Sequence, residues 1–253
     1  MNDEKGSTTI VEPAKSLRGL LRVPGDKSIS HRYAMLAALA NGTTTIRNYS
    51  MGADCQSTLS CLQALGVAIE STRGPQDTGT TVSITGRGLG SLTSPKHPID
   101  TGNSGTTMRL LAGILASHPF TSVLTGDSSL QKRPMHRIIQ PLQQMGATLE
   151  STNGCPPLVV RGTQLTGINF APSVASAQVK SSVLLAGLHA DGTTQVSEPI
   201  ATRDHTERAL SAFGALTQNT NGVFCVTGGS PLEPLDVTIP GDPSSAAFWI
   251  IAA

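Results

Sequence analysis

The stretch PGDKSISHR, at Pro24–Arg32, decides how the rest of the chain is interpreted. Its Pro-Gly turn leads into a helix start at which Asp26 can act as N-cap, and residues 34–40 favour helix. Ser28 and Arg32 stand four residues apart, on one helix face. Cations at a helix N-terminus are unfavourable unless an anion balances them. The stretch therefore predicts an anion site, with an ordinary solvated helix start as the alternative.

The same pattern restarts along the chain at intervals of about seventy residues. Ser28, Ser104, Ser176 and Ser244 open equivalent segments and stand 76, 72 and 68 residues apart. Each complete unit predicts strand, helix, strand, helix, strand, strand. Because one such unit cannot bury its own apolar faces, we expect the units to pack together. The fold class predicted is an inside-out α/β domain of three βαβαββ units, helices inward and sheets outward, followed by the start of a second domain.

The turn residues and apolar runs predict the elements of each unit. In the first unit, Asn41-Gly42 ends the opening helix, and a strand at 43–46, a helix ending at 65 and strands at 68–70 and 82–84 follow. In the second, a helix at 104–115 precedes a strand at 122–125, a helix ending at 145 and bent by Pro141, and strands at 147–150 and 158–161. In the third, a helix at 176–189 precedes a strand at 193–196, a helix ending at 213, and strands at 215–218 and 223–227. A fourth unit begins at 240–247 and breaks off; its apolar run Phe248–Ile251 leads us to expect that the chain is cut from a longer protein.

Composition narrows the classes of ligand. The net charge is +1, charged residues make up 14% and aromatic residues 3% of the chain, which favours a small anion over a polynucleotide. The four cysteines form no CxxC pair and stand at no metal-ligand spacing, so we expect reduced thiols in a cytoplasmic protein. The polar stretch 1–15 and the absence of a long apolar run predict no leader and no membrane span. No phosphate-binding P-loop, dinucleotide fingerprint or Ser-His-Asp motif is present.

Polar residues recur at the four helix starts, and they are the candidate binding residues. If the helices converge, these starts converge too and can hold a polyanionic small molecule; simple N-capping is the alternative, above all for Ser104 and Ser244. Arg133 and Arg203 are cations at loop-to-helix junctions, whereas Lys180 and Arg137 are interpreted as residues on solvated helix faces. The sets are Lys27, Ser28 and Arg32; Asn103, Ser104, Gly105, Thr106 and Arg109; Ser176, Ala177 and Gln178; and Asp242, Ser244 and Ser245.

These motifs resemble those of the 3-phosphoshikimate 1-carboxyvinyltransferase (EPSP synthase) family. They occur in family order along the whole chain: Pro24–Arg32, Gly102–Arg109, Gln131–Met135, Ser176–Ser181, Arg203–Glu207 and Pro240–Ala246. The resemblance implies three parts. Residues 1–22 would be a tail and a strand of an incomplete second domain, 23–236 the three-repeat phosphoshikimate-binding domain, and 237–253 the truncated start of the second domain.

The resemblance also implies substrates and residue roles. The substrates would be shikimate 3-phosphate and phosphoenolpyruvate, and the products enolpyruvylshikimate phosphate and phosphate, with no cofactor, metal, nucleic acid or membrane and with a monomeric protein. Lys27 would be catalytic. Shikimate 3-phosphate would be bound by Lys27, Ser28, Arg32, Ser176, Ala177, Gln178 and Arg203, and phosphoenolpyruvate by Lys27, Asn103, Gly105, Arg133 and Gln178. The family is a glyphosate target, and Gly105 stands where bulk can exclude that inhibitor.

The resemblance to the family also predicts what this chain lacks. The family's second domain supplies further acidic and basic residues, so we expect this chain to bind shikimate 3-phosphate weakly and to turn over very slowly or not at all without a C-terminal half. A non-catalytic phosphoester-binding module is therefore one alternative. A UDP-sugar enolpyruvyl transferase is another, disfavoured because Ser28 replaces an asparagine and no cysteine stands in a matching loop. A nucleic-acid end-modifying enzyme is disfavoured by the charge.

Overall fold

Three similar units follow one another in the computed structural model, which describes residues 16–74 and 79–252. The first unit contains α1 (Lys27–Leu39), β1 (Asn41–Tyr49), α2 (Ala53–Ala64), β2 (Ala68–Arg73) and β3 (Thr80–Arg87). The second contains β4 (Ile99–Asp100), α3 (Gly105–Leu115), β5 (Thr121–Thr125), the 3-10 turn η1 (Leu130–Lys132), α4 (His136–Gln144), β6 (Thr148–Thr152) and β7 (Cys155–Arg161). The third contains β8 (Asn169–Phe170), α5 (Ala177–Gly187), β9 (Thr193–Ser197), α6 (His205–Ala212), β10 (Thr217–Thr220) and β11 (Val223–Thr227), and β12 (Asp236–Thr238) and α7 (Pro243–Ala252) follow.

Each unit builds one four-stranded sheet of the same design. The strand orders are β12-β1-β3-β2, β4-β5-β7-β6 and β10-β11-β9-β8. In every sheet a short strand lies parallel to the strand that follows the inner helix, and the other pairings are antiparallel. In the first sheet this parallel strand is β12, which enters from far along the chain through Thr45↔Asp236 to Arg47↔Thr238. Sequence spacing alone does not reveal that closure.

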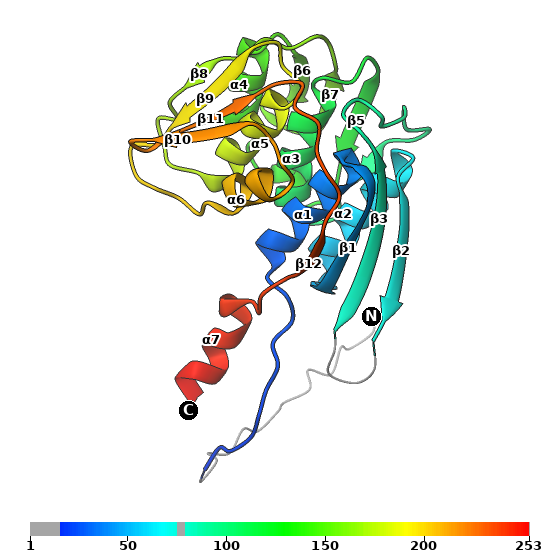
Figure 1. Cartoon of the computed structure of the whole chain (residues 1–253). Coiled ribbons are helices and arrows are strands. Elements are labelled where there is room, and N and C mark those ends of the chain that lie inside the picture. Colours follow the sequence, from blue (N-terminus) through cyan, green and yellow to red (C-terminus); the bar gives the residue numbers. More distant parts are fainter. Residues whose placement is uncertain (1–15, 75–78, 253) are drawn as a thin grey trace, which may run out of the picture.

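The first helix of each unit lies inside the molecule and the sheets lie outside, as predicted (Figure 1). α1, α3 and α5 are buried along almost their whole length, whereas α2, α4 and α6 bury one face. Side chains such as Leu36, Leu111 and Leu184 are 0% exposed, and full burial of one such side chain contributes about 1.5–3 kcal/mol. The inner helices are therefore the core, and their ends are fixed relative to one another.

Small residues let the inner helices and sheets approach closely. A Cβ on Gly113 of α3 would lie 2.2 Å from the backbone oxygen of Ser182 in α5, and one on Gly86 of β3 would lie 2.4 Å from the backbone oxygens of Ala37 and Ala40. Glycine is required at these two positions because the contacts leave no room for a side chain.

The element predictions are confirmed apart from a few boundaries. Asn41-Gly42 does not cap the first helix, because α1 already ends at Leu39 and Asn41 begins β1. α4 contains Pro141 as expected, and it begins at His136. Residues 16–22 form no strand, and the rest of the predicted N-terminal strand region lies outside the described residues. Within the described residues, no helix is long and apolar enough to span a membrane.

Candidate functional site

The starts of the three inner helices meet at one pocket of about 490 Å³. Seven of the candidate binding residues line it, together with three residues that were not predicted. The lining is Ser28 and Arg32 of α1, Thr106 of α3, Ala175, Ser176, Ala177 and Gln178 at the start of α5, and Ala201, Thr202 and Arg203 of the loop before α6. Because the free N–H groups of a helix start favour anions, this convergence gives the pocket features that suit an anion.

Arg32 is the buried cation of the pocket. It is 3% exposed, and its guanidinium donates from Nε to Thr206 Oγ1 at 2.6 Å, from Nη1 to the backbone oxygen of Ser28 at 2.9 Å and from Nη2 to Ser181 Oγ at 2.8 Å. Burial lowers the pKa of Arg32 to about 10, against the opposing effect of Glu207. The group therefore stays charged at neutral pH and is held rigidly towards the pocket.

Arg203 and Ser176 complete the cationic and polar walls. Arg203 is exposed and donates from Nη1 to Ser28 Oγ at 3.4 Å, which joins the third unit to the first. Ser176 is the N-cap of α5 and accepts from the Val179 N–H at 3.5 Å. The capping alternative and the binding prediction are thus both compatible with Ser176.

Gln178 links the pocket to the second unit. Its Nε2 donates to Thr106 Oγ1 at 3.0 Å, and its Oε1 accepts from Arg109 Nη1 at 2.8 Å. Burial lowers the pKa of Arg109, and the nearby Arg133 adds to this effect. This position between two units suits a residue predicted to contact both substrates.

Asn103, Gly105 and Arg133, predicted to bind phosphoenolpyruvate, also lie together. Arg133 Nη2 donates to Asn103 Oδ1 at 2.6 Å, and Asn103 Nδ2 donates to Asp127 Oδ2 at 2.6 Å. The bond from Asn103 is the main reason that the pKa of Asp127 lies below its usual value. A Cβ on Gly105 would lie 2.7 Å from Arg109 Nη1 and 3.5 Å from Arg133 Nη1, so glycine leaves room for the two guanidinium groups.

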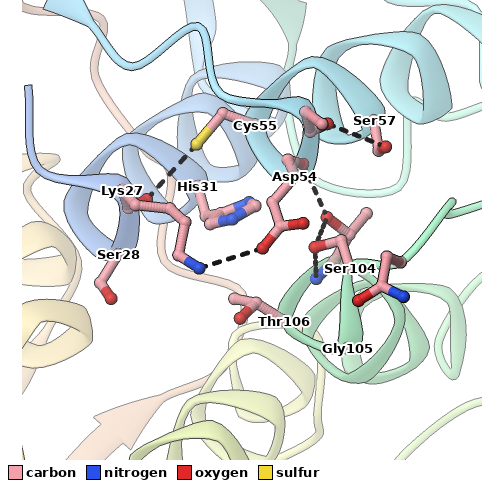
Figure 2. A network of polar contacts seen from close by, with 12 residues as sticks. Lys27, Ser28, His31, Asp54, Cys55, Ser57, Ser104, Gly105 and Thr106 are labelled. Carbon is pink, nitrogen blue, oxygen red and sulfur yellow. Dashed lines mark hydrogen bonds and ion pairs between the residues drawn. The ribbon is translucent and has the colours of Figure 1, made fainter. Parts of the chain in front are cut away.

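Lys27 extends from the start of α1 towards α2. Its Nζ donates to Asp54 Oδ2 at 3.0 Å, and the side chain is 51% exposed. Figure 2 shows this pair with Ser104, Gly105 and Thr106 at the start of α3 beside it. Asp54 was missed by sequence reasoning, because an acidic residue in the first turn of a helix is an ordinary stabilising feature.

A chain of side-chain contacts, mostly between hydroxyl groups, connects α1, α2 and α3. His31 Nδ1 lies 2.6 Å from Thr58 Oγ1, which lies 2.7 Å from Thr107 Oγ1, which in turn donates to Ser104 Oγ at 2.7 Å. Burial lowers the pKa of His31 to about 3. His31 is therefore neutral at physiological pH and acts in packing.

Two further features correct or extend the sequence predictions. Lys180 does not lie on a solvated face: it is 4% exposed and pairs with Glu198 and Glu207, because α5 is enclosed on all sides. Arg137 is exposed, as predicted. The fourth helix start meets the first, since Asp242 accepts from Ser244 N at 2.7 Å and from Lys27 N at 3.3 Å, but it does not line the pocket.

The other pocket, the buried cysteines and the acidic and histidine side chains offer no second catalytic or metal site among the described residues. A second pocket of about 500 Å³, between α4 and residues 169–174, contains none of the predicted site residues. Cys55 and Cys61 are buried, and burial raises the pKa of each to about 12. Among residues 16–74 and 79–252, no group of three or more His, Cys, Asp or Glu residues is arranged to hold a metal ion.

An α/β protein whose repeats aim three helix starts and two arginines at one pocket has the features of a protein that binds small anions. Comparison with known proteins shows the family. The sequence profile described as EPSP synthase (3-phosphoshikimate 1-carboxyvinyltransferase) matches residues 11–253. The chain belongs to the EPSP synthase family.

Individual relatives give the extent of the similarity. The chain is 52% identical over 243 residues to the 3-phosphoshikimate 1-carboxyvinyltransferase of Bacillus velezensis, covering 95% of this chain and 55% of that protein. It is 54% identical over 245 residues to that of Pelotomaculum thermopropionicum, covering 96% and 56%. The solved EPSP synthase of Acinetobacter baumannii superposes with a TM-score of 0.86 at 47% identity, covering 92% of this chain and 52% of the other. The chain thus spans about half the length of the relatives it matches.

Proposed function

We propose that this chain forms the shikimate 3-phosphate-binding part of a 3-phosphoshikimate 1-carboxyvinyltransferase. That enzyme transfers the enolpyruvyl group of phosphoenolpyruvate to shikimate 3-phosphate and releases phosphate. The observation that carries the proposal is the pocket at the three helix starts, where Arg32 and Arg203 converge with Ser28 and Ser176 in a member of this family. We propose that the complete reaction also needs the part of the enzyme that corresponds to the rest of the relatives' length, which this chain does not span.

The residue roles in the proposal follow from charge and position. Shikimate 3-phosphate would be bound by Arg32, Arg203, Ser28 and Ser176, with Ala177 and Gln178, and by Lys27, which precedes Ser28 and does not itself line the pocket. Buried Arg32 supplies a fixed charge and exposed Arg203 closes the far side. Charge-assisted hydrogen bonds from arginine to a phosphate are among the stronger polar contacts. The pocket therefore favours a dianionic phosphate over a neutral ligand.

Phosphoenolpyruvate would bind beside this pocket, at Lys27, Asn103, Gly105, Arg133 and Gln178. The guanidinium groups of Arg109 and Arg133 flank Gly105, so the start of α3 presents both backbone N–H groups and cations to a second anion. Gln178 would contact both ligands because it lies between the two units.

The chemistry requires these cations. Protonation of the methylene carbon of phosphoenolpyruvate makes the adjacent carbon electrophilic, and the hydroxyl oxygen of shikimate 3-phosphate attacks it while its proton passes to a base. The tetrahedral intermediate then loses phosphate together with one proton of its methyl group, which passes to a base and leaves the C=C double bond of the enolpyruvyl product. Lys27, held by Asp54 at 3.0 Å, would stabilise negative charge on phosphoenolpyruvate during these steps.

The proposal includes an organisation of the chain and a setting. Residues 23–238 form the substrate-binding domain, because β12 completes its first sheet and moves the predicted boundary at 236 by two residues. Residues 1–22 and 239–253 would belong to a second domain, whose further residues would complete catalysis. The protein is proposed to work as a cytoplasmic monomer, with no partner other than a C-terminal half. A chain that binds the substrate and shows no turnover even with a C-terminal half would be the phosphoester-binding module.

Calorimetric titration of shikimate 3-phosphate tests the proposal. We expect saturable binding by the chain and a loss of affinity of about 100-fold in a Lys27→Ala, Arg203→Ala double variant, since each removes a charge-assisted contact. An Arg87→Ala, Arg161→Ala variant removes the same charge from sheet strands and should bind like the unmodified chain. Absence of binding by the folded chain would contradict the proposal.

A turnover assay separates the enzyme from the binding module. We expect very slow or no turnover by the chain alone and restored turnover when the C-terminal half of a relative is added. Binding that persists with no restored turnover would favour the module, and full steady-state turnover by the chain alone would contradict the need for a second half.

A further inference from the structure

The loop between β9 and α6 carries Arg203 and forms one wall of the pocket through Ala201, Thr202 and Arg203. Most of it faces outward: Ile200 is 71% exposed, and Pro199 and Arg203 are exposed too. An exposed loop with few buried apolar side chains is mobile unless polar contacts hold it. How the loop is held therefore decides where Arg203 stands.

Glu198 closes this loop onto itself. Its Oε1 accepts from Thr202 Oγ1 at 2.7 Å, and its Oε2 accepts from the Thr202 N–H at 3.2 Å. The carboxylate thus fixes both the backbone and the side chain of the residue immediately before Arg203.

Lys180 anchors the carboxylate to the core. Its Nζ donates to Glu198 Oε2 at 2.6 Å, and the two side chains are only 5% and 8% exposed. Burial by itself raises the pKa of Glu198, but the bonds from Lys180 and Thr202 outweigh it and hold this pKa below its usual value. Glu198 therefore stays ionised and fully bonded.

Lys180 also reaches α6, where it pairs with Glu207 Oε1 at 2.5 Å. Glu207 follows Thr206, which accepts from Arg32 Nε at 2.6 Å. One lysine thus links the loop that carries Arg203 to the helix that holds Arg32. Lys180 compensates the two carboxylates in part, and Glu207 also acts on the charge of Arg32, because it partly opposes the effect of burial, which lowers the pKa of that arginine.

We propose that Glu198 and Thr202 are positioning residues that set the place of Arg203 at the pocket, with Lys180 as their anchor. The proposal rests on the proposed function, because it concerns the same bound phosphate. Neither Glu198 nor Lys180 lines the pocket; they act on the ligand through the Thr202–Arg203 backbone.

The matched variants Thr202→Val and Thr202→Ser test it by titration with shikimate 3-phosphate. Valine has the shape of threonine without the hydroxyl group, whereas serine keeps that group. Because a hydrogen bond to a charged acceptor is lost, we expect Thr202→Val to weaken binding about tenfold and Thr202→Ser to stay within about twofold of the unmodified chain.

An Arg203→Ala background distinguishes positioning from direct contact. If Thr202 acts through Arg203, Thr202→Val should cost less than about twofold in that background, because coupled residues are not additive. An equal loss in both backgrounds would overturn the proposal, since Thr202 would then touch the ligand itself. Unchanged binding by Thr202→Val, or equal losses for valine and serine, would overturn it as well.

Amide hydrogen exchange of residues 200–204 gives a readout that needs no ligand. Exchange should be about tenfold faster in Thr202→Val and unchanged in Thr202→Ser, because the bond to Glu198 closes the loop. If the unmodified chain binds no shikimate 3-phosphate, the proposed function fails. Hydrogen exchange still tests whether the bond between Thr202 and Glu198 holds the loop, and equal exchange in all three proteins would refute that role.

Discussion

The burial of His31 leads us to predict that the protein loses stability in mild acid. Its side chain is 0% exposed, its Nδ1 lies 2.6 Å from Thr58 Oγ1, and its Nε2 has no hydrogen-bond partner among the described residues. Burial, the largest effect, lowers its pKa to about 3, and the nearby Asp54 only partly offsets this. The folded protein therefore keeps His31 neutral at pH values at which an unfolded chain protonates it.

The size of the effect follows from proton linkage. The unfolded histidine has a pKa of about 6.5, so below that pH the unfolded state binds a proton that the folded state does not. The contribution is fully present above pH 6.5 and falls away as the pH drops towards 3. At pH 5.0, 1.5 units below the unfolded pKa, the loss from this one residue is about 2 kcal/mol.

Chemical denaturation at pH 7.5 and 5.0 measures this loss. We expect the decrease in unfolding free energy between the two pH values to be about 2 kcal/mol smaller in His31→Asn than in the unmodified chain. Each protein is compared with itself, so the cost of the substitution cancels. His97 is exposed, and His97→Asn should leave the decrease unchanged. Equal decreases in His31→Asn and the unmodified chain would refute the reasoning.

Three other predictions follow from buried contacts. Lys180→Met should lower the unfolding free energy by about 3–5 kcal/mol, because it leaves two buried carboxylates facing each other without a cation; a change under 1 kcal/mol in chemical denaturation would contradict this. Gly113→Ala usually favours a helix, but here the added carbon would meet Ser182 at 2.2 Å, so we expect a loss of about 1–3 kcal/mol in thermal or chemical unfolding rather than a gain. Iodoacetamide should modify the half-exposed Cys155 and Cys225 well before Cys55 and Cys61, whose pKa values burial raises to about 12; mass spectrometry of the native protein would contradict this if all four reacted at one rate.

The repeat explains why much of the fold was predictable. Local signals recur in each unit, such as the cap Asp26 and the glycines after α2, α4 and α6, and these fix where helices start and stop without long-range information. The pattern of the unit predicted an opening strand, but the positions of the short strands β4, β8 and β12 were not predicted, because two or three residues carry no periodic pattern. They form where a neighbouring strand offers free hydrogen-bonding groups.

The site residues likewise divide into those that the sequence could predict and those that it could not. Ser28, Arg32, Gln178 and Arg203 could be predicted because polar residues recur at equivalent helix starts, and the structure brings them to one pocket. Asp54 could not be separated from an ordinary acid in a first helical turn.

The sequence by itself therefore determined the repeating unit, the inner helices and the residues that open them. The tertiary structure alone decided which polar residues are buried partners. Lys180 looks like a solvated lysine along α5, yet enclosure of that helix turns it into the centre of a buried cluster with Glu198 and Glu207, residues 18 and 27 positions away in the chain. The physical reason is that a charged side chain is placed by the carboxylates that can compensate it, and these come from elements that meet only when the third unit folds.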